Sequence, residues 1–402
     1  MRVLFLSPWF PYPPNNGSKL RILNLLRGLA TRHEVTLLAF ADQPGADPTV
    51  PELRSLCREV RVIPRRAYNP NGVKARLGFL SPLPRSLLDT YSPQIANLVR
   101  KAAATSSPDL AIASQLGAAI YADCLDGVPG LFEEVEVAGL YERYARSRTL
   151  WGRLRHGLTW VKHRRYLASL LRKYSRCTVA SEQEKALLSG IAAGYEPIDV
   201  VPNCVDLADY EKVEQTPQPG TLIFTGSFRY LANHEAMIWF LDKVFPLVQR
   251  SFPGATLTIT GDHADLPLPA AENVTLTGYV DDVRPLVAGA WVSLAPILGG
   301  GGTRLKILEA MALGTPVVAT SKGAEGLDVR DGEHLLVADT PAAFAQAIVS
   351  VLGDSDLRQR LADGAYRLVR EKYDWAVVLP RFLDLAERTA RPASAGRSGD
   401  AG

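Results

Sequence analysis

The chain has 402 residues, of which 47% are hydrophobic and 22% are charged, so it is long enough for two globular domains with buried cores. Its 45 Lys and Arg against 42 Asp and Glu leave a net charge of +3, too small to indicate a nucleic-acid-binding protein. The four cysteines lie far apart without a CxxC pair, which argues against a disulfide framework or a zinc site and predicts buried free thiols.

Short apolar runs rich in β-branched residues alternate with helical patterns from the start of the chain. Residues 3–6 predict a strand, residues 19–30 a helix and residues 35–40 the next strand. This order is typical of βαβ units in a doubly wound parallel sheet. Because Pro8 ends the first apolar run, we interpret that run as a buried strand and not as a signal peptide. No stretch approaches the length of a membrane span, and we expect a cytoplasmic protein.

The same pattern starts again at Thr221. Residues 214–220 before it are rich in Pro and Gln and lack apolar periodicity, which indicates a linker. Further strands are predicted at residues 222–225, 256–260, 274–278, 291–296, 316–320 and 335–337, and a helix at residues 235–250. We therefore predict two Rossmann-like α/β domains that face each other across a cleft.

The expected N-terminal domain covers residues 1–213 and the C-terminal domain residues 214–372. Residues 373–390 predict a helix that packs back toward the N-terminal domain. Residues 391–402 are mostly small or charged, which predicts a disordered tail.

The most informative feature is a glycine-rich segment, residues 299–314. Its four glycines follow a predicted strand and run into a helix pattern with Thr303 as the N-cap, which stops at Gly314. Glycines let the backbone approach a ligand closely, and the N–H groups of a helix N-terminus favour an anion. The segment therefore predicts a binding site for a diphosphate.

Three charged residues of this helix fit the same interpretation. Arg304 and Lys306 are cations in the first turn, where they oppose the helix dipole unless an anion binds there. Glu309 is placed to accept hydrogen bonds from hydroxyls such as those of a ribose. The alternative for Lys306 and Glu309 is a surface ion pair three residues apart, which would contribute little.

The sequence GGGGTRLKILEAMALGTPVVAT at residues 299–320 resembles the donor-site signature of family 4 (group 1) glycosyltransferases with the GT-B fold. The resemblance extends over VPNCVD, FTGSFR, LTGYVDD and GAEG in the second half and PPNNGSKLR in the first, at residues 201–206, 224–229, 276–282, 323–326 and 13–21. It implies a retaining, metal-independent hexosyltransferase that uses a UDP- or GDP-activated sugar. The implied acceptor is a carbohydrate or a lipid-linked molecule, in polysaccharide or glycolipid assembly.

The resemblance also implies which residues bind the donor. The nucleotide would lie in the C-terminal domain, and the cations near its diphosphate would be Arg304, Lys306 and Arg229. Lys306 would also act in catalysis by stabilising the leaving group. The implied donor-binding set is Gly17, Gly226, Arg229, Gly300, Gly301, Gly302, Thr303, Arg304, Lys306 and Glu309.

The sequence departs from the family pattern at two places in the donor site. The first of two glutamates expected there falls on Gly301, so only Glu309 matches. An Arg and Lys pair expected after the first C-terminal strand falls on Ser227 and Asn233. The missing glutamate leaves open a non-catalytic nucleotide-sugar-binding protein, and a sugar-nucleotide epimerase of the same fold is a further alternative.

An acidic stretch, LFEEVEV at residues 131–137, occupies the place where relatives carry a His or Asp near the reacting sugar. Glu133, Glu134 and Glu136 are the candidates to orient the acceptor or to take its proton, and a catalytic role is predicted for Glu133 or Glu136. If the stretch is extended, Glu134 and Glu136 share one face. The alternative is a solvated acidic loop.

Residues 143–176 are dense in Arg and Lys, interleaved with Leu, Trp and Tyr. A basic helix of this kind can bind an anionic membrane surface, here the inner face of the membrane. Alternatively, it is an amphipathic helix whose apolar stripe packs on its own domain. The sequence gives both interpretations equal weight.

Overall fold

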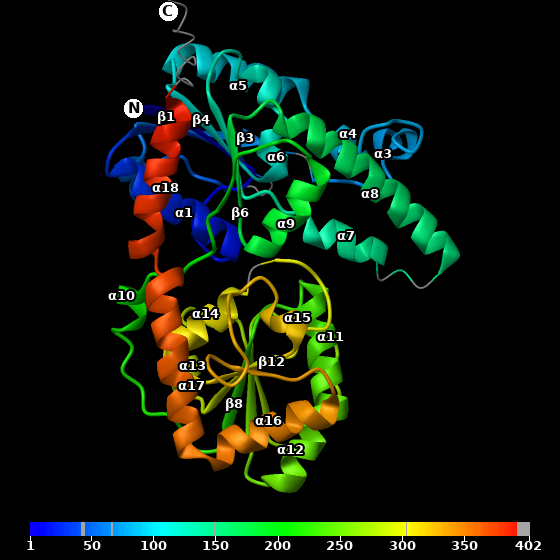
Figure 1. Ribbon diagram of the computed structural model, residues 1–402, viewed down its shortest axis with the longest axis vertical. Helices are drawn as coiled ribbons and strands as arrows, with labels where there is room; N and C mark the ends of the chain where they lie inside the picture. The colour runs from blue at the N-terminus through cyan, green and yellow to red at the C-terminus, as the bar shows by residue number, and fades with distance from the viewer. Residues whose placement is uncertain (42–44, 66, 146, 148, 303, 392–402) are drawn as a thin grey trace, which may run out of the picture. The chain divides into compact units, whose positions relative to one another are not determined.

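The computed structural model describes residues 1–41, 45–65, 67–145, 147, 149–302 and 304–391. They form two compact units: unit 1 contains Met1–Pro202 and the described residues from Leu379 on, and unit 2 contains Asn203–Val378. Each unit has one parallel sheet with helices packed on it (Figure 1). The predicted pair of Rossmann-like α/β domains is confirmed.

The sheet of unit 1 has the strand order β3-β2-β1-β4-β5-β6-β7, and its strand pairs are parallel. β1 is paired on both sides, so that Val3 lies between Val35 of β2 and Leu110 of β4. Its residues from Val3 onward are buried, as expected for a strand covered on both faces. The strands are β1 (Arg2–Ser7), β2 (Glu34–Ala41), β3 (Glu59–Pro64), β4 (Leu110–Ser114), β5 (Gly130–Glu133), β6 (Arg176–Val179) and β7 (Ile198–Val200).

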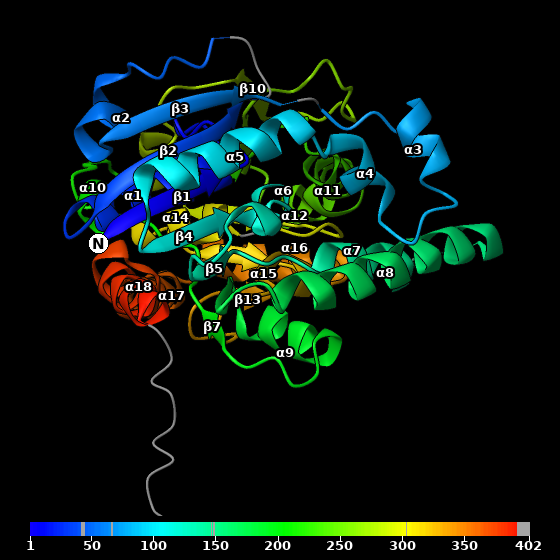
Figure 2. The same ribbon diagram turned by 90° about the horizontal axis from the view of Figure 1, so that it is seen from above.

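The helices of unit 1 differ greatly in length, and α8 is the longest with 22 residues. Its N-terminal half extends past the sheet of its own unit (Figure 2). The helices are α1 (Gly17–Ala30), α2 (Pro51–Leu56), α3 (Val73–Leu77), α4 (Arg85–Thr90), α5 (Pro93–Ser106), α6 (Gln115–Ala119), η1 (Ala122–Cys124), α7 (Ala138–Ala145), α8 (Leu150–Leu171), α9 (Glu182–Ile191) and the end of α18 (Trp375–Ala390).

The sheet of unit 2 has the order β10-β9-β8-β11-β12-β13 and is also parallel. Every strand predicted for this half is present, with ends that differ by at most one residue from the prediction. The strands are β8 (Thr221–Thr225), β9 (Thr256–Thr260), β10 (Val274–Gly278), β11 (Val292–Ala295), β12 (Val317–Ala319) and β13 (Leu336–Val337).

Apolar cores lie on both faces of this sheet. Leu222 and Phe224 of β8 pack into one core, and Ile223 between them packs into the other. Figure 1 accordingly shows α11 and α12 on one side of the strands and α14 and α17 on the other. The helices are α10 (Leu207–Tyr210), α11 (Leu231–Trp239), η2 (Phe240–Val244), α12 (Phe245–Ser251), α13 (Arg284–Ala288), α14 (Leu305–Ala312), α15 (Ser321–Ala324), α16 (Pro341–Gly353), α17 (Ser355–Leu368) and η3 (Val369–Tyr373).

Two predicted boundaries need correction. The helix expected at residues 235–250 is divided by the π-helical turn η2, because Pro246 has no N–H to continue the regular hydrogen-bond pattern. The domain boundary lies at Pro202 and not near residue 213. The intervening segment belongs to unit 2 because Val205 and Leu207 are buried in its core. The four cysteines are buried free thiols, as predicted.

Candidate functional site

The loops after β8 and β11 meet at the carboxyl edge of the sheet in unit 2. The strand order reverses between these neighbouring strands, since β9 and β10 lie on one side and β12 and β13 on the other. In open α/β sheets, ligands bind beside such a reversal point. Gly226 follows β8, and the glycine-rich segment with α14 follows β11. The structure therefore brings together most of the residues predicted to bind the donor.

Lys306 lies at the centre of this edge. Its ammonium donates a hydrogen bond to Oδ1 of Asn233, 3.0 Å away, and lies 4.0 Å from the centroid of the Phe224 ring. Burial, and next the charge of Arg304, lower the pKa of Lys306 to about 7, while Glu309 acts in the opposite direction. A strongly shifted pKa marks a candidate functional site, and the protonated ammonium has three N–H donors with which to bind an anion.

Gly226 makes room for this lysine. A Cβ atom at position 226 would lie 2.7 Å from Nδ2 of Asn233 and 3.0 Å from Nζ of Lys306. Its φ of +145° is also rarely adopted by residues with a side chain. Gly261, which follows β9, lies against the backbone of Gly226, because a Cβ at position 261 would lie 2.7 Å from that backbone. The two glycines thus permit a close backbone crossing beside the lysine.

The glycine-rich loop is held in shape from two sides. Tyr230 donates from its hydroxyl to the carbonyl of Gly301, 2.8 Å away, and a Cβ on Gly300 would lie 2.1 Å from that hydroxyl oxygen. Arg304 is 6% exposed and donates to the carbonyls of Gly300 and Lys322 at 3.2 and 2.9 Å. Gly300 and Gly302 have φ values of +93° and +96°, which favour glycine.

The start of α14 concerns two predictions, Thr303 as the N-cap of the helix and Arg304 as a cation that contacts the diphosphate. Thr303, the predicted N-cap, lies outside the described residues; α14 is described from Leu305 with Arg304 as the preceding cap residue. Arg304 itself directs its guanidinium to the carbonyl of Gly300 in the loop and to that of Lys322 in α15. We therefore interpret Arg304 as a residue that shapes the loop, and direct contact with a diphosphate stays a prediction for it.

Glu309 lies one turn after Lys306 on α14. Its Oε1 accepts a hydrogen bond from the hydroxyl of Tyr210, 3.2 Å away, and burial raises its pKa. Among the described residues, Lys306 is bonded to Asn233 and Glu309 to Tyr210, so the two do not form the surface ion pair considered above. A second carboxylate oxygen remains for a hydroxyl group of a ligand.

Arg229 differs from the other predicted cations because its side chain is 75% exposed. It forms an ion pair with Asp262, and its part in donor binding stays a prediction. Tyr210, Tyr230 and Phe224 were missed as site residues, because nothing in their local sequence shows which side chain they contact. Asn233 was noted only as a departure from the family pattern.

Unit 1 has a polar pocket at the corresponding place in its own sheet. The order of strands reverses between β1 and β4, and residues that follow these strands line a cavity of about 300 Å³. This volume is at the lower end of the range for small-molecule sites. The lining residues are Pro8, Trp9, Arg65, Gln115, Leu116, Gly117, Glu134, Glu136, Gly139 and Leu140.

The two predicted catalytic glutamates lie in different environments. Glu136 is exposed and lines the polar pocket, whereas the side chain of Glu133 is 0% exposed. Glu133 accepts hydrogen bonds from Nε of Arg21 at 2.6 Å and from Ser114 at 2.7 Å. Burial raises its pKa, and Arg21 opposes that effect. We therefore interpret Glu133 as a positioning residue, because its oxygens do not face solvent.

The segment after β5 is not extended, which corrects the expected arrangement of Glu134 and Glu136 on one face. The strand ends at Glu133, and Glu134 has a φ of +56°. Gln115, which follows β4, also has a φ of +56° and donates to Oε2 of Glu134 at 2.8 Å. Its side-chain carbonyl accepts from Nε1 of Trp9 at 2.9 Å. These bonds fix the position of the indole at the edge of the pocket.

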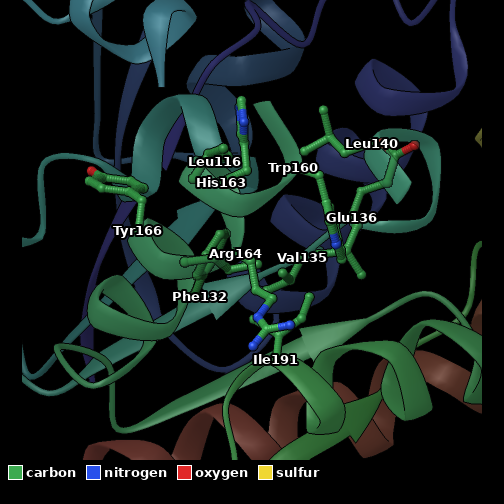
Figure 3. Close-up of a pocket in the computed structure, with 12 residues that line it drawn as sticks. Leu116, Phe132, Val135, Glu136, Leu140, Trp160, His163, Arg164, Tyr166 and Ile191 are labelled. Carbon is green, nitrogen blue, oxygen red and sulfur yellow. The ribbon is translucent and has the colours of Figure 1, made fainter. Parts of the chain in front are cut away.

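A second, apolar pocket adjoins the first and shares Leu116, Glu136 and Leu140 with it. Figure 3 shows Trp160, Tyr166 and Arg164 of α8 among the side chains around it. Its cavity volume is about 20 Å³, which is enough for roughly one water molecule. The polar pocket is therefore the better candidate for a ligand the size of a sugar.

Gly17 belongs to unit 1 and not to the unit that contains the other predicted donor residues. It is the first residue of α1, after the N-cap Asn16, whose Oδ1 accepts from the backbone N–H of Lys19 at 2.9 Å. Its role in donor binding stays a prediction.

Each unit matches a known domain family. Residues 16–204 match the family model "Glycosyl transferase 4-like domain", and residues 219–354 match "Glycosyl transferases group 1". The two models together cover most of the chain. With the two parallel sheets, these matches define the class: the chain has the GT-B fold, and each of its two domains matches a glycosyltransferase domain family.

Relatives in sequence and in structure agree with this class. Phosphatidyl-myo-inositol mannosyltransferase of Mycobacterium leprae is 34% identical over 206 residues, which are 49% of this chain and 53% of that protein. The chain thus spans about half the length of the curated relatives it matches.

Two solved structures match almost the whole chain. Sucrose-phosphate synthase from Thermosynechococcus elongatus has a TM-score of 0.69 at 17% identity, covering 96% of this chain and 99% of that one. Anabaena HepE in complex with UDP-glucose has a TM-score of 0.66 at 15% identity, with 96% and 100% covered. At these identities the likeness shows the fold.

Proposed function

We propose that the protein transfers a sugar from a nucleotide diphosphate sugar to a hydroxyl acceptor, with retention of configuration. The observation that carries this proposal is Lys306, whose ammonium lies beside Asn233 and Gly226 at the reversal point of the sheet, on the helix that follows the glycine-rich loop. The complex of HepE with UDP-glucose supports a donor of this chemical class. The mannosyltransferase relative supports transfer of a hexose.

The donor would bind with its diphosphate at Lys306 and at the N–H groups of the glycine-rich loop. Among the described residues, Lys306 donates one hydrogen bond, so further N–H donors remain for phosphate oxygens. When the sugar leaves, negative charge develops on the diphosphate, and a fixed cation there stabilises the transition state. We propose that this side chain and the loop do so without a metal ion. Glu309 would bind the ribose.

The acceptor would bind in the polar pocket of unit 1. Trp9 offers an apolar ring face to a sugar, and Arg65 and Glu136 offer polar contacts at the same cavity. We propose that Glu136 orients the acceptor hydroxyl and that Glu133 holds Arg21 in place beneath it. The name of the mannosyltransferase relative refers to a phospholipid, which supports a lipid-linked acceptor in glycolipid or polysaccharide assembly.

Thermal unfolding in the presence of UDP, GDP and their sugar conjugates tests the donor, because a ligand that binds the native state raises the melting temperature. The selected nucleotide sugar is then incubated with the wild type, and slow hydrolysis is measured. We expect hydrolysis to be lost in Lys306→Ala and kept in Lys243→Ala, an exposed lysine of the same unit. Ligand binding without any turnover would instead favour a non-catalytic nucleotide-sugar-binding protein.

Retention is tested separately by the anomeric configuration of the first product, read by NMR. Glu136→Gln should lower the rate of transfer to an acceptor and leave donor binding unchanged. Unchanged transfer in Glu136→Gln would remove this glutamate from the mechanism.

A further inference from the structure

Ten large apolar side chains of unit 1 are exposed on two segments. On the N-terminal half of α8 they are Leu150, Trp151, Leu154, Leu158 and Val161, of which Trp151 is 84% exposed. On α3 and the chain that follows it they are Val73, Leu77, Phe79, Leu80 and Leu83, of which Leu80 is 91% exposed. We call these ten residues the α3–α8 surface. Exposed apolar patches of this kind mark interaction sites.

The exposed residues of α8 lie on one side of the helix. At 3.6 residues per turn, the five side chains fall within an arc of about 100°. The buried residues Leu167, Leu170 and Leu171 fall on the opposite arc. The helix therefore has two apolar faces, and the exposed one is not the face that packs on its own unit. The buried face agrees with a helix that packs on its own domain, and the exposed stripe leaves membrane binding as a proposal.

Positive charge borders the exposed stripe on both sides. Arg153 and Arg164 lie along one edge of the arc, and Arg155 and Lys162 along the other. The sequence has no Asp or Glu between Glu142 and Glu182, and none between Glu59 and Asp89. Both segments of the α3–α8 surface thus carry Arg and Lys residues, with no Asp or Glu near them along the chain. Such a border is complementary to an anionic surface.

The two segments are tied together although they are far apart in the chain. Nζ of Lys162 donates to the carbonyls of Gly78 and Phe79, at 3.2 and 2.9 Å. The guanidinium of Arg85 lies 3.7 Å from the centroid of the Phe79 ring and donates to the carbonyl of Ala75 at 2.6 Å. The turn after α3 is therefore held against α8, which brings the apolar residues of the two segments into the same region of unit 1.

We propose that the α3–α8 surface binds an anionic lipid bilayer. The apolar side chains would enter the boundary between head groups and acyl chains, and the bordering Arg and Lys would bind the head groups. This is attachment in the plane of the interface: among the described residues, no helix is long and apolar enough to cross a membrane. The proposal does not depend on sugar transfer, since it concerns other residues.

Sedimentation of the full chain with vesicles tests the proposal. We expect binding to vesicles of phosphatidylcholine mixed with phosphatidylglycerol, at least about tenfold weaker binding to phosphatidylcholine alone, and loss of binding as salt is raised. The double variant Arg153→Gln/Arg155→Gln should weaken binding by about 30-fold, since each basic residue near the surface contributes roughly a factor of five. The matched control is Arg100→Gln/Lys101→Gln, two exposed cations on α5.

A second set of variants tests whether the exposed apolar side chains enter the bilayer. Trp151→Glu/Leu154→Glu should abolish binding, whereas Leu98→Glu on α5, where the leucine is 42% exposed, should not. Circular dichroism and the thermal unfolding of each variant verify that unit 1 is folded. Equal binding to neutral and anionic vesicles, or no binding to either, would overturn the proposal. The proposal would also be overturned if the wild type does not bind vesicles but self-associates, and the Glu variants lose this self-association. A second copy of the chain would then cover the surface.

Discussion

Lys306 of α14 donates a hydrogen bond to Asn233 of α11 across a distance of 3.0 Å, so the side chain reaches from one face of the sheet toward the other at its carboxyl edge. The ammonium packs against the ring of Phe224, and Gly226 leaves space for it because glycine has no Cβ atom. The lysine is thus held in one position before any ligand arrives. A fixed cation needs little reorganisation when negative charge develops beside it.

Donor binding should weaken as the pH rises above about 7. Burial lowers the pKa of Lys306 to about 7, and a bound diphosphate would raise it again, because an anion favours the charged form. Binding is therefore strongest where the free lysine is already protonated and declines by up to tenfold per pH unit above that range. Titration calorimetry with a nucleotide sugar measures this profile. In Lys306→Ala the slope should disappear; an identical slope in that variant would contradict the assignment.

Substitution of Glu309 should weaken the binding of the nucleoside part of the donor and not that of its diphosphate. Glu309→Gln replaces one carboxylate oxygen by an amide, so we expect nucleoside diphosphate to bind about tenfold more weakly. Inorganic pyrophosphate lacks the ribose and should bind the variant as it binds the wild type. Lys306→Ala, in contrast, should weaken the binding of both ligands. If Glu309→Gln weakens pyrophosphate equally, its contact is with the diphosphate and not with the ribose.

Gly226→Ala should abolish donor binding without unfolding unit 2. The added Cβ would lie 2.7 Å from Asn233 and 3.0 Å from Lys306, so the ammonium must leave its position. Gly278→Ala is the matched control, because Gly278 has a φ of +70° but no atom within 4 Å of an added Cβ. Both variants place Ala at a positive φ, which costs about 1–3 kcal/mol of backbone strain. Only Gly226→Ala should lose nucleotide binding, as measured by calorimetry.

The pair formed by Arg21 and Glu133 should stabilise unit 1. Both side chains are at most 1% exposed, so Arg21→Met leaves a buried carboxyl without its cation and should cost about 3–5 kcal/mol. Arg21→Met/Glu133→Leu removes both charges and should cost less. Hydrogen exchange of the β4 and β5 amides reports on this unit separately. Arg58→Met, which breaks an exposed pair with Glu34, should change the exchange little.

Much of the fold could be predicted because its strands are buried on both faces. Such strands are continuous apolar runs, as at β1 and β8, and short turns with glycine separate them from helices. The glycine-rich loop could likewise be read from the chain, since glycine is required where φ is positive or the backbone is crowded. Local rules of this kind involve only residues near one another in sequence.

The sequence by itself therefore determined two parallel-sheet domains and the glycine-rich loop before α14, and it predicted Arg304, Lys306 and Arg229 as the cations of the site. Only the tertiary structure decided that Glu133 is buried against Arg21, that Asn233 and Tyr210 are the partners of Lys306 and Glu309, and that the apolar stripe of α8 is exposed. The physical reason is distance along the chain. These contacts join residues separated by 73 to 112 positions, and the exposure of a helix face depends on what else packs there.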